Sequence, residues 1–280
     1  MKYLYFLALI QILSFNILSA QSNASCCQAS SIKAFTDLAN DISFVMTHEE
    51  PLPFILQDPK GKNISFPIAG GEDGKGYYIS GKKNNYKWIF VFQEWWGLND
   101  YIRLQADMLQ TSFPDAHILA VDLYDGKVAT TREEAGALMQ AASPERIEKI
   151  ILGASNYSGT SSKIATIGWC FGGAWSNKAA IMLGKKAAAC IMYYGMPVKD
   201  EAQLSQLTAP VLGIFADQDG WITPKVVSEF KESMIKLNKS VETYGYSADH
   251  AFANPSNPKY NKSFSEDAWN KSVAFLKKHL

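Results

Sequence analysis

The sequence has little net charge and few residues of the kinds that bind metals or form crosslinks. Lysine plus arginine number 27 and aspartate plus glutamate also number 27, so the formal net charge is zero. No basic cluster stands out, and we therefore expect no nucleic-acid partner. The chain has four cysteines and four histidines, and it lacks the C-x-x-C spacing typical of zinc sites. We expect neither a metal nor an organic cofactor.

Long apolar runs are also absent beyond the N-terminus. Lys2 precedes a mostly apolar run from Tyr3 to Leu18, and Ala20 offers a small residue for cleavage. This pattern is typical of a secretory signal peptide over residues 1–20 and predicts a secreted or periplasmic protein. An uncleaved N-terminal anchor is the alternative. No later segment could cross a bilayer, so we expect no membrane span after signal removal, and we expect a monomer.

Strand-like and helix-like patterns alternate from residue 71 to residue 280. This alternation predicts an α/β fold, with a mostly parallel central sheet and helices on both faces. A Lys/Asn-rich loop at 81–85 predicts a hairpin between the first two strands. Residues 21–70 are interpreted as an N-terminal extension packed on the main domain, with His48 as a surface or packing residue. The expected strands are 76–80, 88–92, 117–123, 164–167, 187–194, 211–216 and 241–246.

One stretch carries the strongest chemical signal. An apolar run at 164–167 ends in Gly-Trp-Cys-Phe-Gly-Gly, and a helical pattern follows over 174–183. G-x-C-x-G-G between a strand and a helix is typical of the nucleophile elbow of an α/β-hydrolase, with cysteine replacing serine. A dinucleotide-binding loop fits poorly because its glycine spacing differs. The alternative is a buried structural cysteine, Cys170, in a glycine-rich turn.

A nucleophilic cysteine needs a histidine base, and the base needs an acid that orients it. In hydrolases of this fold the chain order is nucleophile, acid, histidine. His250 directly follows a predicted strand, whereas His279 is the penultimate residue, so His250 is the expected base. Asp217 and Asp219 compete as the acid. We favour Asp219, which stands three residues before an apolar β-branched residue; Asp249 is a third candidate.

Backbone N–H groups must hold the oxyanion that forms when the cysteine attacks a carbonyl. We expect them from Phe171, directly after the cysteine, and from Trp95, which follows another strand. Aromatic side chains gathered at these strand ends would line an apolar substrate pocket. The pocket residues expected are Trp96, Trp169, Trp221 and Tyr124.

Together these motifs resemble the dienelactone hydrolase family. The resemblance runs from about residue 75 to the C-terminus and rests on Gly-Trp-Cys-Phe-Gly-Gly, Gln-Glu-Trp-Trp-Gly-Leu-Asn, Asp-Leu-Tyr, His-Ala-Phe and the Asp219 loop. It implies a Cys170–Asp219–His250 triad that cleaves an ester or lactone through a thioester. It also implies that Glu94 is the family glutamate that interacts with the resting cysteine until substrate binding releases it.

Two family arginines, which bind the substrate carboxylate, are missing. The chain reads Asp125-Gly126-Lys127 after the first motif and Ala253-Asn254 after the second. We therefore expect a different, less anionic small-molecule ester or lactone as the substrate. A thiol amidase or peptidase on the same triad is one alternative, and a catalytically silent binding protein is another.

Overall fold

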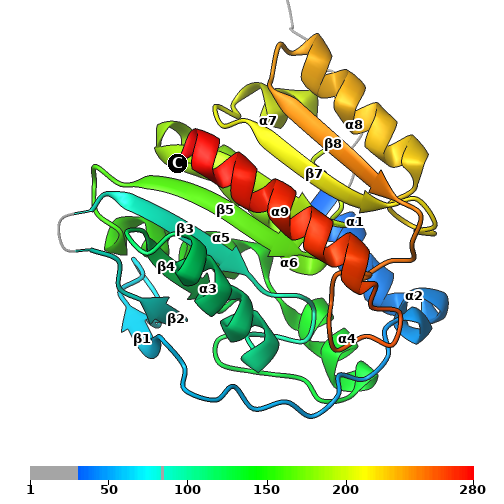
Figure 1. Cartoon of the computed structure of the whole chain (residues 1–280), viewed down its shortest axis with the longest axis horizontal. Coiled ribbons are helices and arrows are strands. Elements are labelled where there is room, and N and C mark those ends of the chain that lie inside the picture. The colour runs from blue at the N-terminus through cyan, green and yellow to red at the C-terminus, as the bar shows by residue number, and fades with distance from the viewer. Residues whose placement is uncertain (1–30, 83–84) are drawn as a thin grey trace, which may run out of the picture.

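The computed structural model describes residues 31–82 and 85–280, so the predicted signal peptide lies outside the described residues. One sheet of eight strands forms the centre of this part of the chain (Figure 1), in the order β1-β2-β4-β3-β5-β6-β7-β8. The strands β3 to β8 pair in parallel, and β1 and β2 are antiparallel additions at one edge. Their bounds are Lys62–Phe66, Gly74–Ile79, Lys87–Phe92, His117–Val121, Lys163–Trp169, Ala187–Tyr193, Val211–Ala216 and Val241–Tyr246.

Helices cover both faces of the sheet. In Figure 1, α3 and α9 lie in front of the strands, while α5 and α6 lie behind them. This arrangement confirms the predicted α/β-hydrolase fold class. The α-helices are α1 (Ser31–Asp37), α2 (Ile42–Thr47), α3 (Asp100–Ser112), α4 (Arg132–Ala141), α5 (Pro144–Tyr157), α6 (Phe171–Leu183), α7 (Glu201–Ser205), α8 (Pro224–Lys236) and α9 (Lys262–His279), with short 3-10 turns at Leu38–Asn40 and Gly184–Lys186.

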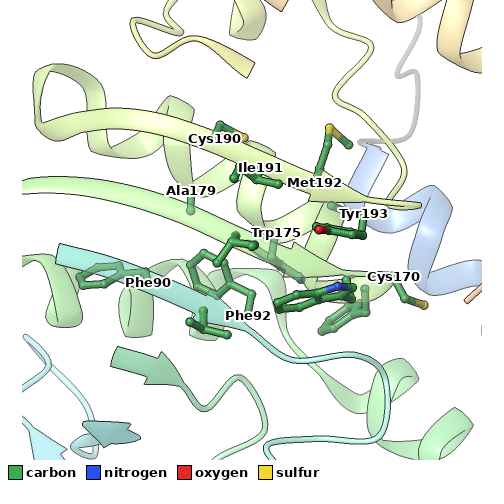
Figure 2. Close-up of a cluster of buried hydrophobic side chains, with 14 of the residues drawn as sticks. Phe90, Phe92, Cys170, Trp175, Ala179, Cys190, Ile191, Met192 and Tyr193 are labelled. Atoms are coloured by element: carbon green, nitrogen blue, oxygen red, sulfur yellow. The ribbon is translucent and has the colours of Figure 1, made fainter. Parts of the chain in front are cut away.

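The central strands are apolar almost throughout because both of their faces are covered. Every residue of β3 after Lys87 is buried, as is every residue of β5 after Lys163. Figure 2 shows Phe90, Cys190 and their neighbours packed between strands and helices, with Cys170 at the end of its strand. Cys190 is thus part of the core, whereas Cys170 stands where the core meets the edge of the sheet.

The predicted hairpin around residues 81–85 is wrong. β2 and β3 do not pair, because β4 lies between them and pairs antiparallel with β2 and parallel with β3. A loop rich in lysine and asparagine indicates a turn, but it does not show whether the two strands that it connects pair with each other.

The segment before residue 71 supplies one edge strand of the sheet and two of the helices that pack on the main domain. Its strand β1 forms the outer edge of the sheet against β2. Its helices α1 and α2 lie on the other side of the molecule, where α1 packs on α6 and both contact α4. Within the described ranges, no helix is long and apolar enough to span a membrane.

Candidate active site

The carboxyl ends of four parallel strands meet at one edge of the sheet, and each carries a candidate reactive group. Glu94 follows β3, Cys170 follows β5, Asp219 follows β7 and His250 follows β8. Ligand sites in open α/β sheets form at such edges. All four side chains are buried.

Cys170 occupies a strained turn between β5 and α6. Its backbone has φ 55° and ψ −117°, in a region that residues with a Cβ seldom adopt. The turn is tight because Gly172 packs on the end of the neighbouring strand β3, where an added Cβ would meet the carbonyl oxygens of Phe92 and Gln93. The helix starts at Phe171, whose N–H has no partner within the helix and points to the sulfur. The elbow therefore exposes the thiol to the strand-end site.

Asp219 and His250 form a buried pair, with the Nδ1 atom of His250 2.5 Å from Asp219 Oδ2. The other carboxylate oxygen accepts the N–H groups of Trp221 and Ile222, each at 2.9 Å. Burial alone would lower the pKa of His250, but the carboxylate and the sulfur of Cys170 raise it well above its ordinary value. The backbone bonds and the imidazole hold the pKa of Asp219 below its ordinary value despite burial.

The other candidate acids, Asp217 and Asp249, and the other candidate base, His279, lie elsewhere. Asp217 is exposed, and Asp249 forms an ion pair with Lys259 at 3.1 Å. His279 packs on Phe275 at the end of the last helix. The structure therefore brings Asp219, and neither of its competitors, against His250.

Cys170 is only 1% exposed, and a ring nitrogen of His250 lies within 4.8 Å of its sulfur. Burial raises the pKa of the thiol, and His250 and the Phe171 N–H offset this only in part. The Nε2 atom of His250 is buried and has no hydrogen-bond partner within the described part of the chain. A thiol and an unpaired imidazole nitrogen thus face each other across a closed site.

A second histidine also reaches the sulfur. His48 follows α2, is 2% exposed, and places its Nε2 atom 3.8 Å from Cys170 Sγ. Its Nδ1 atom lies 2.8 Å from the carbonyl oxygen of Phe44, and because a carbonyl only accepts, Nδ1 carries the proton. Burial and the neighbouring His250 lower the pKa of His48 to about 3, so its Nε2 lone pair faces the sulfur.

The N-terminal segment also covers the site with an aromatic side chain. Phe44 is fully buried, and its ring contacts His250 at 5.9 Å and Trp221 at 5.2 Å between centroids. Trp221 in turn donates its indole N–H to Asp41 at the start of α2. Of the predicted pocket residues, Trp221 therefore packs under the N-terminal segment.

The remaining predicted aromatic residues are buried around the same edge. The ring of Trp95 lies 4.5 Å from that of His48 and 5.0 Å from that of Trp96. Tyr124 packs on Phe171 at 5.5 Å, and its hydroxyl is buried without a partner in the part of the chain that the structure describes. These rings make the surroundings of the sulfur apolar.

Glu94 lies in the site, but its carboxylate is directed to other partners. Oε1 accepts the hydroxyl of Tyr194 at 3.2 Å, and Oε2 accepts the side-chain amide of Asn254 at 2.5 Å. Burial raises the pKa of Glu94 to about 7, against the opposing effects of His250 and these two bonds. In this state Glu94 acts on Cys170 through its charge, and His48 is the hydrogen-bonding neighbour of the sulfur.

Beside Glu94 lies a cavity of about 20 Å³, which is room for roughly one water molecule. Trp169, another predicted pocket residue, lines it together with Asn254, and none of its lining residues is a lysine or arginine. The cavity stops short of Cys170. The sulfur is therefore closed to this cavity, with His48 packed against it.

The strand order, the elbow and the strand-end cluster define an α/β-hydrolase. The family model of the dienelactone hydrolase family matches residues 75–280, and the chain belongs to this family. "Protein usf" of Aquifex pyrophilus is 26% identical over 72% of this chain and 93% of its own length. A "Putative carboxymethylenebutenolidase" of Aquifex aeolicus is 24% identical over 69% and 88%.

A solved structure shows the same fold. The "Putative Dienelactone Hydrolase" of Klebsiella pneumoniae superposes with a TM-score of 0.68 at 19% identity, over 78% of this chain and 99% of its own. The family resemblance inferred from the motifs is thus confirmed, and the chain is a hydrolase at the level of its family.

Sequence reasoning missed four residues at the site: His48, Phe44, Tyr194 and Asn254. His48 and Phe44 precede the family match, and the packing of α2 brings His48 to the sulfur and Phe44 to the rings of His48 and His250. Tyr194 stands directly after β6 in a backbone conformation with φ 35°, and its position at a strand end was a usable signal. Asn254 stands shortly after His-Ala-Phe, and its role as a partner of Glu94 is visible only in three dimensions.

Proposed function

We propose that this protein hydrolyses a carboxylic ester or lactone through a thioester on Cys170. The observation that carries the proposal is the buried Asp219–His250 pair at the same strand edge as a cysteine in a nucleophile elbow. The family supports hydrolysis, and the Aquifex aeolicus relative is named as a putative carboxymethylenebutenolidase. Catalysis uses Cys170 as nucleophile, His250 as base and Asp219 as the group that orients it.

The reaction follows from this arrangement. The thiol proton passes to His250 as sulfur bonds to the carbonyl carbon, and the oxyanion takes hydrogen bonds from the N–H groups of Phe171 and Trp95. When the carbon–oxygen bond breaks, His250 returns the proton to the leaving alkoxide. His250 then removes a proton from water, the water attacks the thioester, and the carboxylic acid and free thiol are released.

The substrate is less anionic than a dienelactone. Arg132 follows the first family motif, but its guanidinium donates to the carbonyl of His48 at 2.7 Å and pairs with Glu49 at 2.9 Å. The cavity beside Glu94 has no cationic lining, and the rings around Cys170 are apolar. A neutral ester or lactone meets no unpaired charge in these surroundings. The protein acts on it outside the cytoplasm, as the predicted signal peptide indicates.

Hydrolysis of a panel of activated esters and lactones, with and without a carboxylate, tests the proposal. We expect turnover of neutral substrates by the parent and none by Cys170→Ala, with Cys190→Ser as the matched control at the other buried cysteine. A stopped reaction should contain the acylated Cys170 peptide in its mass spectrum. Full turnover by Cys170→Ala would overturn the mechanism. Turnover of amides alone would favour the amidase alternative, and no turnover at all would favour a binding protein.

A further inference from the structure

Three side chains gather at the sulfur, and acyl transfer requires only two of them, Cys170 and His250; His48 has no role in that reaction. One ligand atom each from His48, Cys170 and His250 lies within 4.8 Å of the others, and all three residues are buried. These residues come from α2's C-terminal end, the elbow and the loop after β8. We propose that they form a zinc-binding site with one thiolate and two imidazole ligands, and that zinc at this site blocks the nucleophile.

The distances suit the ion. Zinc binds sulfur at about 2.3 Å and imidazole nitrogen at about 2.0–2.1 Å, so two such ligands in tetrahedral geometry stand roughly 3.6 Å apart. Cys170 Sγ and His48 Nε2 are separated by 3.8 Å. The widest pair in the set needs to close by about an ångström to fit the same geometry.

Both imidazoles are oriented as metal ligands are. A ligating histidine donates its second ring N–H to a carboxylate or a backbone carbonyl, which fixes the tautomer and directs the free lone pair at the metal. His250 uses Asp219 for this purpose, and His48 uses the carbonyl of Phe44. The unpartnered Nε2 atom of His250 is the buried polar atom that a metal would satisfy.

The charges balance as well. A buried divalent cation needs about two negative charges close by. The thiolate of Cys170 supplies one, and the Asp219 carboxylate behind His250 supplies the other. Binding replaces the single proton shared by sulfur and His250: a Zn–S bond forms, and that proton leaves to solvent. The rings of Phe44 and Trp95 pack against His48 and shield the site from solvent.

Zinc would also join the N-terminal segment to the main domain, because His48 belongs to the former and Cys170 to the latter. The sulfur and His250 are the groups that the proposed hydrolysis needs, so inhibition by zinc rests on the proposed function. Binding itself does not, and it can be measured without a substrate.

The test uses Co²⁺ and Zn²⁺ with the chain carrying Cys26→Ser and Cys27→Ser, so that these two adjacent thiols cannot contribute. We expect one metal ion and one released proton per chain, and a thiolate-to-cobalt charge-transfer band in the near ultraviolet. Affinity should fall by about 100-fold or more in His48→Gln and in Cys170→Ser, more than for loss of a supporting hydrogen bond. It should be unchanged in the matched controls His279→Gln and Cys190→Ser.

X-ray absorption at the zinc edge keeps the proposal testable if a variant fails to fold. The wild-type chain should show one sulfur and two imidazole nitrogens around the ion. A shell of oxygens only, affinity unchanged in His48→Gln, or no binding by the folded parent would overturn the proposal. Binding without ester turnover would defeat the proposed hydrolysis alone, whereas turnover that zinc does not affect would defeat the inhibitory site alone.

Discussion

His48 Nε2 lies 3.8 Å from Cys170 Sγ, although 122 positions separate the two residues in the chain. The contact joins a segment that precedes the family match to the elbow at the heart of that match. The cluster of Cys170, Asp219 and His250 is therefore covered by a part of the chain that lies before the family match. Some of the groups around the sulfur, His48 and Phe44 among them, come from this preceding segment.

The Asp219 carboxylate should be essential and its neighbour Asp217 should not. Asp219→Asn keeps the size of the side chain but no longer fixes the tautomer of His250, and we expect a loss of about 10³- to 10⁴-fold in kcat for ester hydrolysis. Asp217→Asn should retain near-parental kcat, because Asp217 is exposed and away from His250. Steady-state kinetics on an activated ester check both, and the reverse order would overturn the assignment of the acid.

Glu94 should make stability depend on pH. Burial raises its pKa from 4.5 to about 7, so between these values the folded state binds the proton more tightly than the unfolded state does. The stabilising effect of protonation is complete below about pH 4.5 and is lost as pH rises through 7. Relative to Glu94→Gln, the parent should lose roughly 3 kcal/mol in its free energy of unfolding across this range.

Urea unfolding of both proteins at several pH values measures this difference. The comparison is between the slopes of the two curves, so any constant cost of placing an amide beside Asn254 cancels. Parallel curves for the parent and Glu94→Gln would show that the carboxyl titrates at its ordinary pKa in the folded protein.

Phe44 should control access to the sulfur. Phe44→Ala removes a fully buried ring that contacts His250 and Trp221, which would cost about 3–5 kcal/mol if the segment stayed in place. We therefore expect the segment to open locally and alkylation of Cys170 by iodoacetamide to rise by about tenfold or more. Mass spectrometry of the Cys170 peptide gives the rate. Phe54→Ala, at a partly exposed ring packed on Tyr101, is the control and should leave the rate unchanged.

Arg132 should hold the segment that carries His48 and Glu49 in place rather than bind substrate. Arg132→Gln loses the bond to the carbonyl of His48 and the ion pair with Glu49. We expect kcat/KM to change by the same factor for neutral esters and for esters that carry a carboxylate. Paired kinetics on two such substrates of equal size are the measurement. A rise in KM confined to the carboxylated ester would show that Arg132 replaces a missing family arginine.

Gly172 should tolerate no side chain. A Cβ there would meet two backbone carbonyl oxygens at the end of the neighbouring strand β3, and backbone cannot move aside as a side chain can. Gly172→Ala should cost about 3 kcal/mol or more in the free energy of unfolding. Gly220→Ala is the matched control, since an added Cβ there would meet nothing within 4 Å. Equal melting temperatures for the two variants would contradict the packing of the elbow.

The sequence predicted the parts of the site that depend on local pattern and chain order. Cys170 stands in a motif that combines a strand, glycines and a helix, and the order of groups in the fold directs attention to Asp219 and His250. The structure places these three side chains at one edge, as the strand pattern implied. His48 had no such signal, because only the packing of the short helix α2, distant in the sequence, brings it to the sulfur.

The fold was predicted where burial leaves a clear mark in the sequence. Strands such as β3 and β5 are continuous apolar runs. Strand β1, Lys-Asn-Ile-Ser-Phe, is short and mostly exposed, so its composition resembles that of a loop. The pairing of β2 with β4 depends on contacts between distant residues and not on the loop that follows β2. Local composition therefore predicts neither strand β1 nor the pairing of β2 with β4.

Strand β1 has a practical consequence for expressing the protein. The family match starts at residue 75, and a fragment cut there would lack β1 and begin inside β2. Its sheet would present the unpaired backbone groups of β2 to solvent, and such an edge recruits strands from other molecules. The same cut would remove α2 and uncover the apolar rings around Cys170. Aggregation of a family-sized fragment would therefore reflect where it was cut, and a soluble fragment should retain both α2 and β1.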